Sequence, residues 1–381
     1  MNFKLSTESE DFRKSVKTFC EKEIAPYADK LDREEMGAHE HFKKMGDMGI
    51  LGITFPSEYG GSDADLITYA VGAEELSVAC ASTSLAVNAS TTLAGEPINH
   101  FGTDEQKKKY LTGVTSGEMV GCFGLTEPGC GSDAAALQTF AEKKNGGYVL
   151  NGTKMFITNG PVADFAIVIA RTSKEGGPKG ISAFVVDKGT KGFSAGKPIN
   201  KMGVRGSSTS ELIFEDCKIP AENLLGKEGE GFKIAMQTLE YARISISCFC
   251  LGIARAAMED SIAYAETRMA FGKPIGAFQS VNHKIADMRM YTETARNLIY
   301  HAAWLKQEGH PEANVMISIA KLFASEKATR IVNDAVQIHG GYGYSREYRV
   351  ERLYRDVKLG EIGEGTSEVQ RMIIAKHLLK D

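Results

Sequence analysis

The sequence lacks the features that stabilise many small secreted proteins and metalloproteins. Its seven cysteines are an odd number with no Cys-x-x-Cys pair, which disfavours a secreted disulfide framework and predicts reduced thiols. No His-Glu-x-x-His sequence occurs, and we expect no metal site. Proline is scarce, with 10 residues, whereas the 40 glycines cluster in short motifs. These glycine-rich motifs are therefore the main candidates for functional sites.

An excess of positive charge is also missing. Lys and Arg number 45 and Asp and Glu 49, so the formal net charge is −4, which disfavours nucleic-acid binding. The N-terminal region has no apolar signal core. The most apolar long stretch, residues 244–258, is too short and polar to span a bilayer and predicts a buried helix. We expect a cytoplasmic, bacterial protein that binds neither nucleic acid nor membrane.

The length of 381 residues predicts two or three domains, and the sequence pattern changes twice. Residues 1–120 have the apolar spacing of helices. Residues 121–225 contain short β-branched runs between turn residues, which predict an antiparallel sheet or small barrel. Residues 226–381 are helical again, with short connections that predict a bundle. The expected fold class is α+β: an N-terminal α-helical domain, a middle antiparallel β domain and a C-terminal four-helix bundle, with these boundaries.

Local signals predict where individual helices lie. In the C-terminal zone we expect long helices near residues 229–268, 280–308, 312–339 and 347–376. Three Ser/Thr-x-x-Glu/Gln sequences predict capping boxes at helix starts: Thr7 with Glu10, Thr103 with Gln106, and Ser367 with Gln370.

Two motifs in the β zone are candidate ligand contacts. Residues 123–133 read FGLTEPGCGSD, where Gly129 and Gly131 allow close backbone approach and Thr126 and Ser132 offer hydroxyls. An ordinary tight turn explains this motif equally well, and it is not a GxGxxG fingerprint. Residues 154–160 read KMFITNG, which fits either a planar cofactor contact or a strand that ends in an Asn-Gly turn.

Two further motifs lie at predicted helix ends. Arg268, in RMAFG, fits either a bidentate phosphate contact or a cation that stabilises a helix C-terminus. Residues 337–344 read QIHGGYGY, in which the paired glycines fit either a helix C-cap or space for a pyrophosphate.

The last motif places a carboxylate between two glycines. Glu364 stands between Gly363 and Gly365 in GEIGEGTSE, directly before a predicted helix. Such a residue is free of neighbouring side chains and could project into a cleft as a general base. The alternative is an exposed turn glutamate.

Together, and in this order, the motifs TEPGCGSD, ITNG, KMGVRGSST, QIHGGYGY and EGTSE resemble those of the acyl-CoA dehydrogenase family over essentially the whole chain. The resemblance is closest to the short-chain, butyryl-CoA type. It implies one FAD per subunit, an acyl-CoA substrate, electron-transferring flavoprotein as electron acceptor, and a homotetramer built as a dimer of dimers.

The resemblance also implies a role for individual residues. Glu364 would be the catalytic base, because the alternative position used by some branched-chain members is Ala242 here. The substrate contacts would be Ser132, Glu240, Arg243, Gly363 and Gly365. The FAD contacts would be Phe123, Leu125, Thr126, Ser132, Phe156, Thr158, Arg268, Phe271, Gln279, Gln337, Gly340, Gly341, Thr366 and Glu368, of which those from 268 to 341 would reach the FAD of a neighbouring subunit.

One departure from the family pattern concerns the residue before the base. The family usually has Tyr there, whereas this chain has Gly363. The loss of a phenol ring removes roughly 150–250 Å² of packing surface. The predicted substrate range therefore includes branched or bulkier acyl groups.

The implied reaction is α,β-dehydrogenation of a short-chain acyl-CoA to the trans-2-enoyl-CoA. The same residues would serve an enoyl-CoA reductase in anaerobic metabolism, so the sequence leaves the direction open. An acyl-CoA oxidase would usually be longer than 381 residues. A non-catalytic helical binding protein is the remaining alternative, and the joint presence of Glu364, Thr158 and Arg268 disfavours it.

Overall fold

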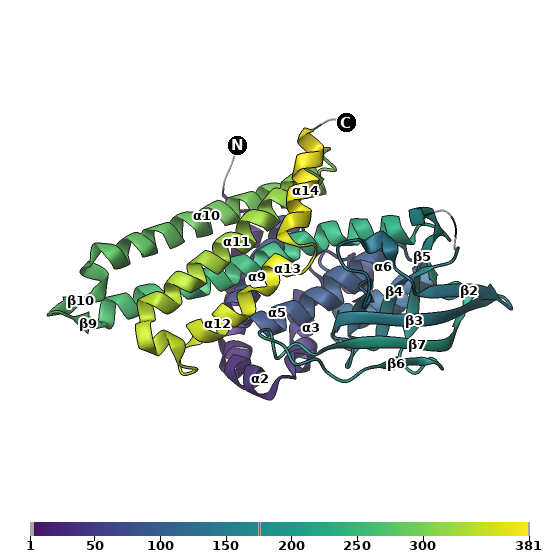
Figure 1. Cartoon of the computed structure of the whole chain (residues 1–381), viewed down its shortest axis with the longest axis horizontal. Coiled ribbons are helices and arrows are strands. Elements are labelled where there is room, and N and C mark those ends of the chain that lie inside the picture. Colours follow the sequence, from purple (N-terminus) through teal and green to yellow (C-terminus); the bar gives the residue numbers. More distant parts are fainter. Residues whose placement is uncertain (1–3, 174, 176, 380–381) are drawn as a thin grey trace.

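The computed structural model describes residues 4–173, 175 and 177–379. Its elements follow the predicted order of helices, sheet and helices (Figure 1). The N-terminal helical part contains α1 (Thr7–Glu23), α2 (Ala28–Glu34), α3 (Phe42–Asp47), α4 (Leu66–Ala79), α5 (Ala81–Asn88), the π-helical segment Ala89–Gly95, α6 (Glu96–Phe101), α7 (Asp104–Gln106), a second π-helical segment Lys107–Leu111 and α8 (Thr112–Thr115).

The caps of these helices only partly follow the sequence prediction. The capping box of Thr103 and Gln106 is confirmed, with both reciprocal hydrogen bonds present. The predicted box of Thr7 and Glu10 is wrong, because the helix begins one residue earlier than that pattern requires. The N-cap of α1 is Ser6, whose Oγ accepts a hydrogen bond of 3.1 Å from the Ser9 N–H.

The middle part is an eight-stranded sheet. Seven strands follow the order β6-β7-β3-β2-β4-β5-β8, and β1 pairs with β4 beside this path. The strands are β1 (Gly121–Gly124), β2 (Phe140–Lys144), β3 (Gly147–Thr158), β4 (Phe165–Arg171), β5 (Ile181–Asp187), β6 (Phe193–Ala195), β7 (Thr209–Pro220) and β8 (Leu224–Leu225).

The sheet is mainly antiparallel, as predicted, but it also contains parallel pairs. β1 lies parallel to β4, because it enters the sheet from helix α8 and not from a hairpin turn. Phe140 of β2 also pairs in parallel with Arg171 of β4. Both faces of β4 are buried: Phe165 and Ile167 pack with side chains of α6 and α9, whereas Ala166 and Val168 pack with those of β3, β5 and β7.

The C-terminal part is built around α9 (Gly231–Thr267), which packs against α10 (Gln279–Gln307), α11 (Ala313–His339) and α4 (Figure 1). The predicted buried helix at residues 244–258 lies within α9 and is confirmed. Among the described residues, this one helix has the length and hydropathy of a membrane span, and 89% of the apolar window is buried inside the protein. A short hairpin of β9 (Met269–Ala270) and β10 (Lys273–Pro274) joins α9 to α10.

The expected fourth long helix, near residues 347–376, is wrong. The chain forms three shorter helices there, α12 (Arg349–Val357), α13 (Leu359–Ile362) and α14 (Ser367–Leu378). The backbone is extended at Gly363 and left-handed at Glu364 and Gly365, so it cannot continue a right-handed helix. The interruption places a turn, and with it Glu364, between two helices.

Buried ion pairs join the N-terminal helices to the bundle. Arg255 of α9 contacts Glu74 and Glu75 of α4 at 2.7 and 2.5 Å. Arg296 of α10 also contacts Glu74, at 2.8 Å. Both glutamates are buried, so these cations compensate charges that water does not reach.

We predict that Arg255→Met lowers the free energy of unfolding by about 3–5 kcal/mol, because it leaves Glu75 buried without its main cation. Urea unfolding followed by circular dichroism measures this effect. Arg371→Met is the control, because its ion pair with Glu326 is largely exposed and should contribute less than about 1 kcal/mol. Equal losses in the two variants would contradict the prediction.

Candidate functional site

Glu364 lies in the turn between α13 and α14 with φ of 57°, a left-handed conformation that is uncommon for a non-glycine residue. Gly365 follows with φ of 89°, a conformation that glycine adopts without the steric cost of a Cβ. Glu364 is half-buried in this turn. The sequence alternative of an exposed turn glutamate therefore does not describe it.

Three side chains from three helices hold the backbone of this turn. The Arg243 Nε donates to the Glu364 carbonyl at 3.2 Å, and the Lys321 Nζ donates to the Gly365 carbonyl at 2.8 Å. Gln370 Nε2 donates to the same two carbonyls at 3.3 and 2.9 Å. Because Arg243 lies on α9, Lys321 on α11 and Gln370 on α14, the position of the turn depends on how these helices pack.

The predicted capping box of Ser367 and Gln370 is wrong, because Gln370 is occupied by the turn. The N-cap of α14 is Thr366, whose Oγ1 accepts a hydrogen bond of 3.3 Å from the Val369 N–H. Pattern reasoning identified Gln370 but assigned it to the helix. Lys321 gave no signal, because a lysine inside a helical pattern is usually an exposed residue.

The protonated form of the Glu364 carboxyl is more favoured in this protein environment than it would be for a carboxyl in water. Burial raises the pKa of the Glu364 carboxyl above its ordinary value, and the charges of Lys321 and Arg243 partly oppose that shift. Burial also lowers the pKa of Lys321 and of Arg243. A carboxylate whose pKa is raised accepts a proton more readily than an ordinary surface carboxylate does.

Glu240 and Arg243, the two predicted substrate contacts on α9, lie one helical turn apart. Glu240 is engaged with Lys306 of α10, whose Nζ also lies 4.7 Å from the centre of the Tyr241 ring. Arg243 is buried and faces the Glu364 turn. The structure therefore brings Arg243 to the candidate base and gives Glu240 a cation as partner.

A buried ion pair joins the two motifs of the β zone. Lys154 of β3 is fully buried, and its Nζ donates to Glu127 at 2.7 Å and to the Leu125 carbonyl at 3.1 Å. Burial lowers the pKa of Lys154 to about 8. The Met155 N–H donates to the Thr126 carbonyl at 2.8 Å, so the loop after β1 lies directly against the end of β3. Sequence reasoning missed both Glu127 and Lys154, although each stands inside a motif that it identified.

The predicted FAD contacts in this region differ in how far their side chains are exposed to solvent. The side chains of Phe123 and Leu125 are buried in the core between the sheet and the helices, so they leave only backbone atoms for a ligand. Phe156, in contrast, has a positive φ of 60° and a side chain that is 62% exposed. Ser132 is exposed, and Thr158 is half-buried at the end of β3.

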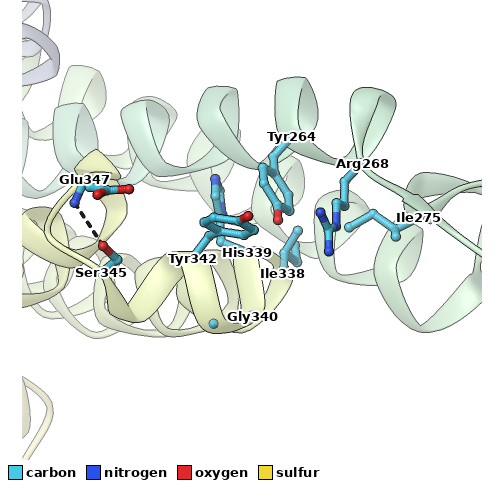
Figure 2. A pocket seen from close by; sticks show the side chains of 10 residues that line it. Tyr264, Arg268, Ile275, Ile338, His339, Gly340, Tyr342, Ser345 and Glu347 are labelled. Carbon is cyan, nitrogen blue, oxygen red and sulfur yellow. Dashed lines mark hydrogen bonds between the residues drawn. The ribbon is translucent and has the colours of Figure 1, made fainter.

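Arg268, Gly340 and Gly341 line one open pocket of about 590 Å³ at the far end of α9 (Figure 2). Tyr264 stacks on His339 with ring centres 4.3 Å apart, and the Arg268 guanidinium lies 5.5 Å from the Tyr342 ring centre. Gly340 has φ of 60° and ψ of −134°. The space beside Gly340 and Gly341 is open, because no described residue other than their chain neighbours lies within 4 Å of a Cβ built there.

Other predicted FAD contacts lie outside this pocket. Phe271, in the β9–β10 turn, is 96% exposed and has a positive φ of 49°. Gln279 and Gln337 are exposed, and Glu368 is exposed in the first turn of α14 beside the cap residue Thr366. None of these residues is among those that line the Arg268 pocket in the described part of the chain.

Models of a known protein family match the helical, β and helical parts of the chain in turn. Models of the acyl-CoA dehydrogenase N-terminal, middle and C-terminal domains match residues 6–118, 122–217 and 229–379. The chain belongs to the acyl-CoA dehydrogenase family. The predictions of this family, of its fold and of an oxidoreductase are therefore confirmed.

Two relatives and one solved structure are similar to this chain over nearly its whole length. The short-chain specific acyl-CoA dehydrogenase of Clostridium acetobutylicum is 47% identical, and the match covers 100% of both chains. The acryloyl-CoA reductase (NADH) of Anaerotignum propionicum is 45% identical over 100% of this chain and 96% of the relative. A chain in the solved structure described as the electron transferring flavoprotein of Acidaminococcus fermentans superposes with a TM-score of 0.98, with 46% identity and full coverage of both chains.

We predict that the two glycines beside Glu364 respond differently to an added methyl group. Gly365→Ala should lower the free energy of unfolding by at least about 1–2 kcal/mol, because the left-handed conformation disfavours a Cβ. That Cβ would also lie 2.9 Å from Gln370 Nε2. Urea unfolding of the two alanine variants measures the difference.

Gly363→Ala is the matched control. Its backbone is extended, and a Cβ there meets Leu359 at ordinary contact distances of 3.4–3.8 Å. We expect this variant to be neutral or stabilised by about 0.4–1 kcal/mol. A loss at Gly363 as large as that at Gly365 would show that the turn has no conformational asymmetry.

Proposed function

We propose that this acyl-CoA dehydrogenase oxidises a short-chain acyl-CoA between its α and β carbons to the trans-2-enoyl-CoA, with Glu364 as the catalytic base. The observation that carries the proposal is the Glu364 turn, in which a carboxyl with a raised pKa is held beside two buried cations. The short-chain specific relative, 47% identical over its full length, supports the substrate class.

Glu364 would remove the α-proton of the thioester. That proton becomes acidic enough only when the thioester carbonyl is polarised, and a backbone N–H aimed at the carbonyl oxygen can provide this stabilisation. Gly363 and Gly365 leave the backbone on both sides of Glu364 free of large side chains. Arg243 and Lys321 would keep part of the Glu364 population ionised despite its burial.

The residues at hand fit FAD as the cofactor. A Cβ built at Gly129, Gly131, Gly340 or Gly341 meets no described residue within 4 Å apart from its chain neighbours, so the backbone at these glycines can approach a ligand closely. The Ser367 Oγ and the Gln370 Oε1 are buried at the start of α14 with no hydrogen-bond partner among the described residues.

We propose that Thr126, Ser132, Phe156, Thr158, Thr366 and Glu368 hold the FAD of their own subunit, with backbone contacts from Phe123 and Leu125. FAD, when bound, supplies the acceptor for the β-hydride.

Two observations bear on electron transfer and direction. The structural match to a chain in a structure of an electron transferring flavoprotein supports that flavoprotein as the electron acceptor. The acryloyl-CoA reductase relative favours a second candidate function, in which the same site reduces a 2-enoyl-CoA and Glu364 donates the proton. Assays with butyryl-CoA plus a dye acceptor, and with crotonyl-CoA plus reduced flavoprotein, compare the two directions.

The length of α9 supports a complete site that needs two subunits. Arg243 and Arg268 lie at the two ends of a helical segment about 38 Å long. This separation favours contacts from the Arg268 pocket to a different FAD from the one beside the Glu364 turn of the same chain. We propose that Arg268, Phe271, Gln279, Gln337, Gly340 and Gly341 contact the FAD of a neighbouring subunit in a cytoplasmic homotetramer, a dimer of dimers.

We predict that Glu364→Gln retains FAD and binds acyl-CoA but loses at least about 10²–10⁴-fold in kcat, because an amide cannot accept the proton. In the wild type, kcat/KM should fall as the pH drops through a pKa above the ordinary carboxyl value, since burial raises that pKa. Stopped-flow bleaching of the flavin at several pH values measures both effects. Activity of Glu364→Gln within about threefold of wild type would remove Glu364 from the mechanism.

We predict that Gly363→Tyr narrows the substrate range toward straight short chains. A Cβ is accommodated at this position, and a phenol ring would occupy space beside the base. Bulky acyl groups should lose about 10–200-fold more kcat/KM than butyryl-CoA does, as measured with butyryl-, isovaleryl- and phenylpropionyl-CoA. Equal losses for all three would show that no widened pocket exists.

We predict that Arg268→Ala lowers both FAD content and tetramer stability. The Arg268 guanidinium of one subunit would bind a phosphate of the FAD held by its neighbour, so its loss would weaken both contacts. Flavin absorbance and sedimentation velocity measure the two quantities. The control is Arg289→Ala, which removes an exposed arginine of α10. A fully loaded, intact Arg268→Ala tetramer would leave Arg268 as a helix C-terminal cation only.

A further inference from the structure

Lys321 is a buried charge that takes no direct part in the proposed proton and hydride transfers. Its side chain is fully buried on α11, and the Gly365 carbonyl accepts its hydrogen bond at 2.8 Å. Among the described residues Lys321 forms no salt bridge within 4.0 Å, and its hydrogen-bond partner is the Gly365 carbonyl. A buried ammonium without an ion pair is costly. Its placement beside the turn of the base therefore needs a reason other than stability.

The charged and titratable groups around the turn come from every helix that packs against it. Glu361 of α13 is already paired with Lys358 at 2.5 Å. Arg243 is committed to the Glu364 carbonyl. The charged and titratable groups that act on the turn among the described residues include Arg243 and Cys250 on α9, Lys321 on α11, Glu361 on α13, and Glu368 and Arg371 on α14.

We propose that Lys321 is a positioning residue that acts on Glu364 in two ways: its hydrogen bond holds the Gly365 carbonyl, and its charge favours the ionised carboxylate. The proposal rests on the proposed role of Glu364 as the base. Burial raises the pKa of Glu364, and among the charges that oppose this shift Lys321 ranks before Arg243. Removal of the ammonium should therefore make Glu364 harder to ionise.

Gln370 separates the two effects of Lys321. Its Nε2 donates to the same Gly365 carbonyl at 2.9 Å and to the Glu364 carbonyl at 3.3 Å, but it carries no charge. Gln370 and Lys321 are both fully buried. Lys321→Met and Gln370→Met therefore both remove a donor to the turn, whereas only Lys321→Met also removes a charge.

The experiment compares wild type, Lys321→Met, Gln370→Met and Glu364→Gln as FAD-loaded enzymes. The pH dependence of kcat/KM gives the acid limb of each variant. An infrared pH titration, with the Glu364→Gln spectrum subtracted, reads the ionisation of the Glu364 carboxyl without turnover. Hydrogen exchange of the amides of residues 363–367 reports the order of the turn. Lys321→Gln, which keeps a donor without the charge, replaces Lys321→Met if that variant does not fold.

We expect Lys321→Met to move the acid limb and the infrared midpoint upward by about 1 pH unit, within the range known for a close opposite charge. Gln370→Met should speed hydrogen exchange in the turn and lower kcat while both midpoints stay where they are in the wild type. An unchanged infrared midpoint in Lys321→Met, or an equal shift in Gln370→Met, would overturn the proposal.

These outcomes are distinct from a failure of the proposed function. If Glu364→Gln remained active, Glu364 would not be the base. The infrared titration would still decide whether Lys321 controls the ionisation of Glu364.

Discussion

Hydrogen bonds to two backbone carbonyls hold the turn on which this enzyme's candidate chemistry depends. A left-handed non-glycine residue costs on the order of 1–3 kcal/mol and persists only where the surroundings over-determine it. At Glu364 the donors are Arg243, Lys321 and Gln370, each from a different helix. The geometry of one carboxylate is thus tied to the packing of the whole bundle. The buried ion pairs between α4, α9 and α10 act on the same packing.

Backbone strain in this chain coincides with the residues that the sequence motifs single out. Nine non-glycine residues have a positive φ among those described, and four of them are Asn or Asp, which tolerate that region. The other five are Glu35, Phe156, Val204, Phe271 and Glu364. Four of these five, all except Glu35, lie in the motifs quoted from the sequence. Strain of this kind commonly marks sites where a side chain must be held in one direction.

The sequence predicted the fold more completely than the contacts within the site. Apolar periodicity gave α9, α10 and α11 within two residues of their observed ends, because long amphipathic helices carry strong signals. In the last zone the motif around Glu364 indicated a helix start near Ser367, but the prediction of one long helix over residues 347–376 was wrong, because donors from other helices hold a turn between α13 and α14. Pattern reasoning likewise named Glu364 and Thr126 but missed Lys321 and Lys154, since a buried lysine has no periodic signature. Such residues become visible only when the three-dimensional packing shows which carbonyls they reach.

The two glycines beside Glu364 have unequal freedom to evolve. Gly365 is locked by its left-handed backbone and by Gln370, so almost any substitution there would disturb the turn. Gly363 has an extended backbone with room for a Cβ, so an alanine there would leave the turn intact. One neighbour of the carboxylate can therefore drift while the other is held constant. Duplicated copies of such a gene could diverge in substrate choice through position 363 without first losing their stability.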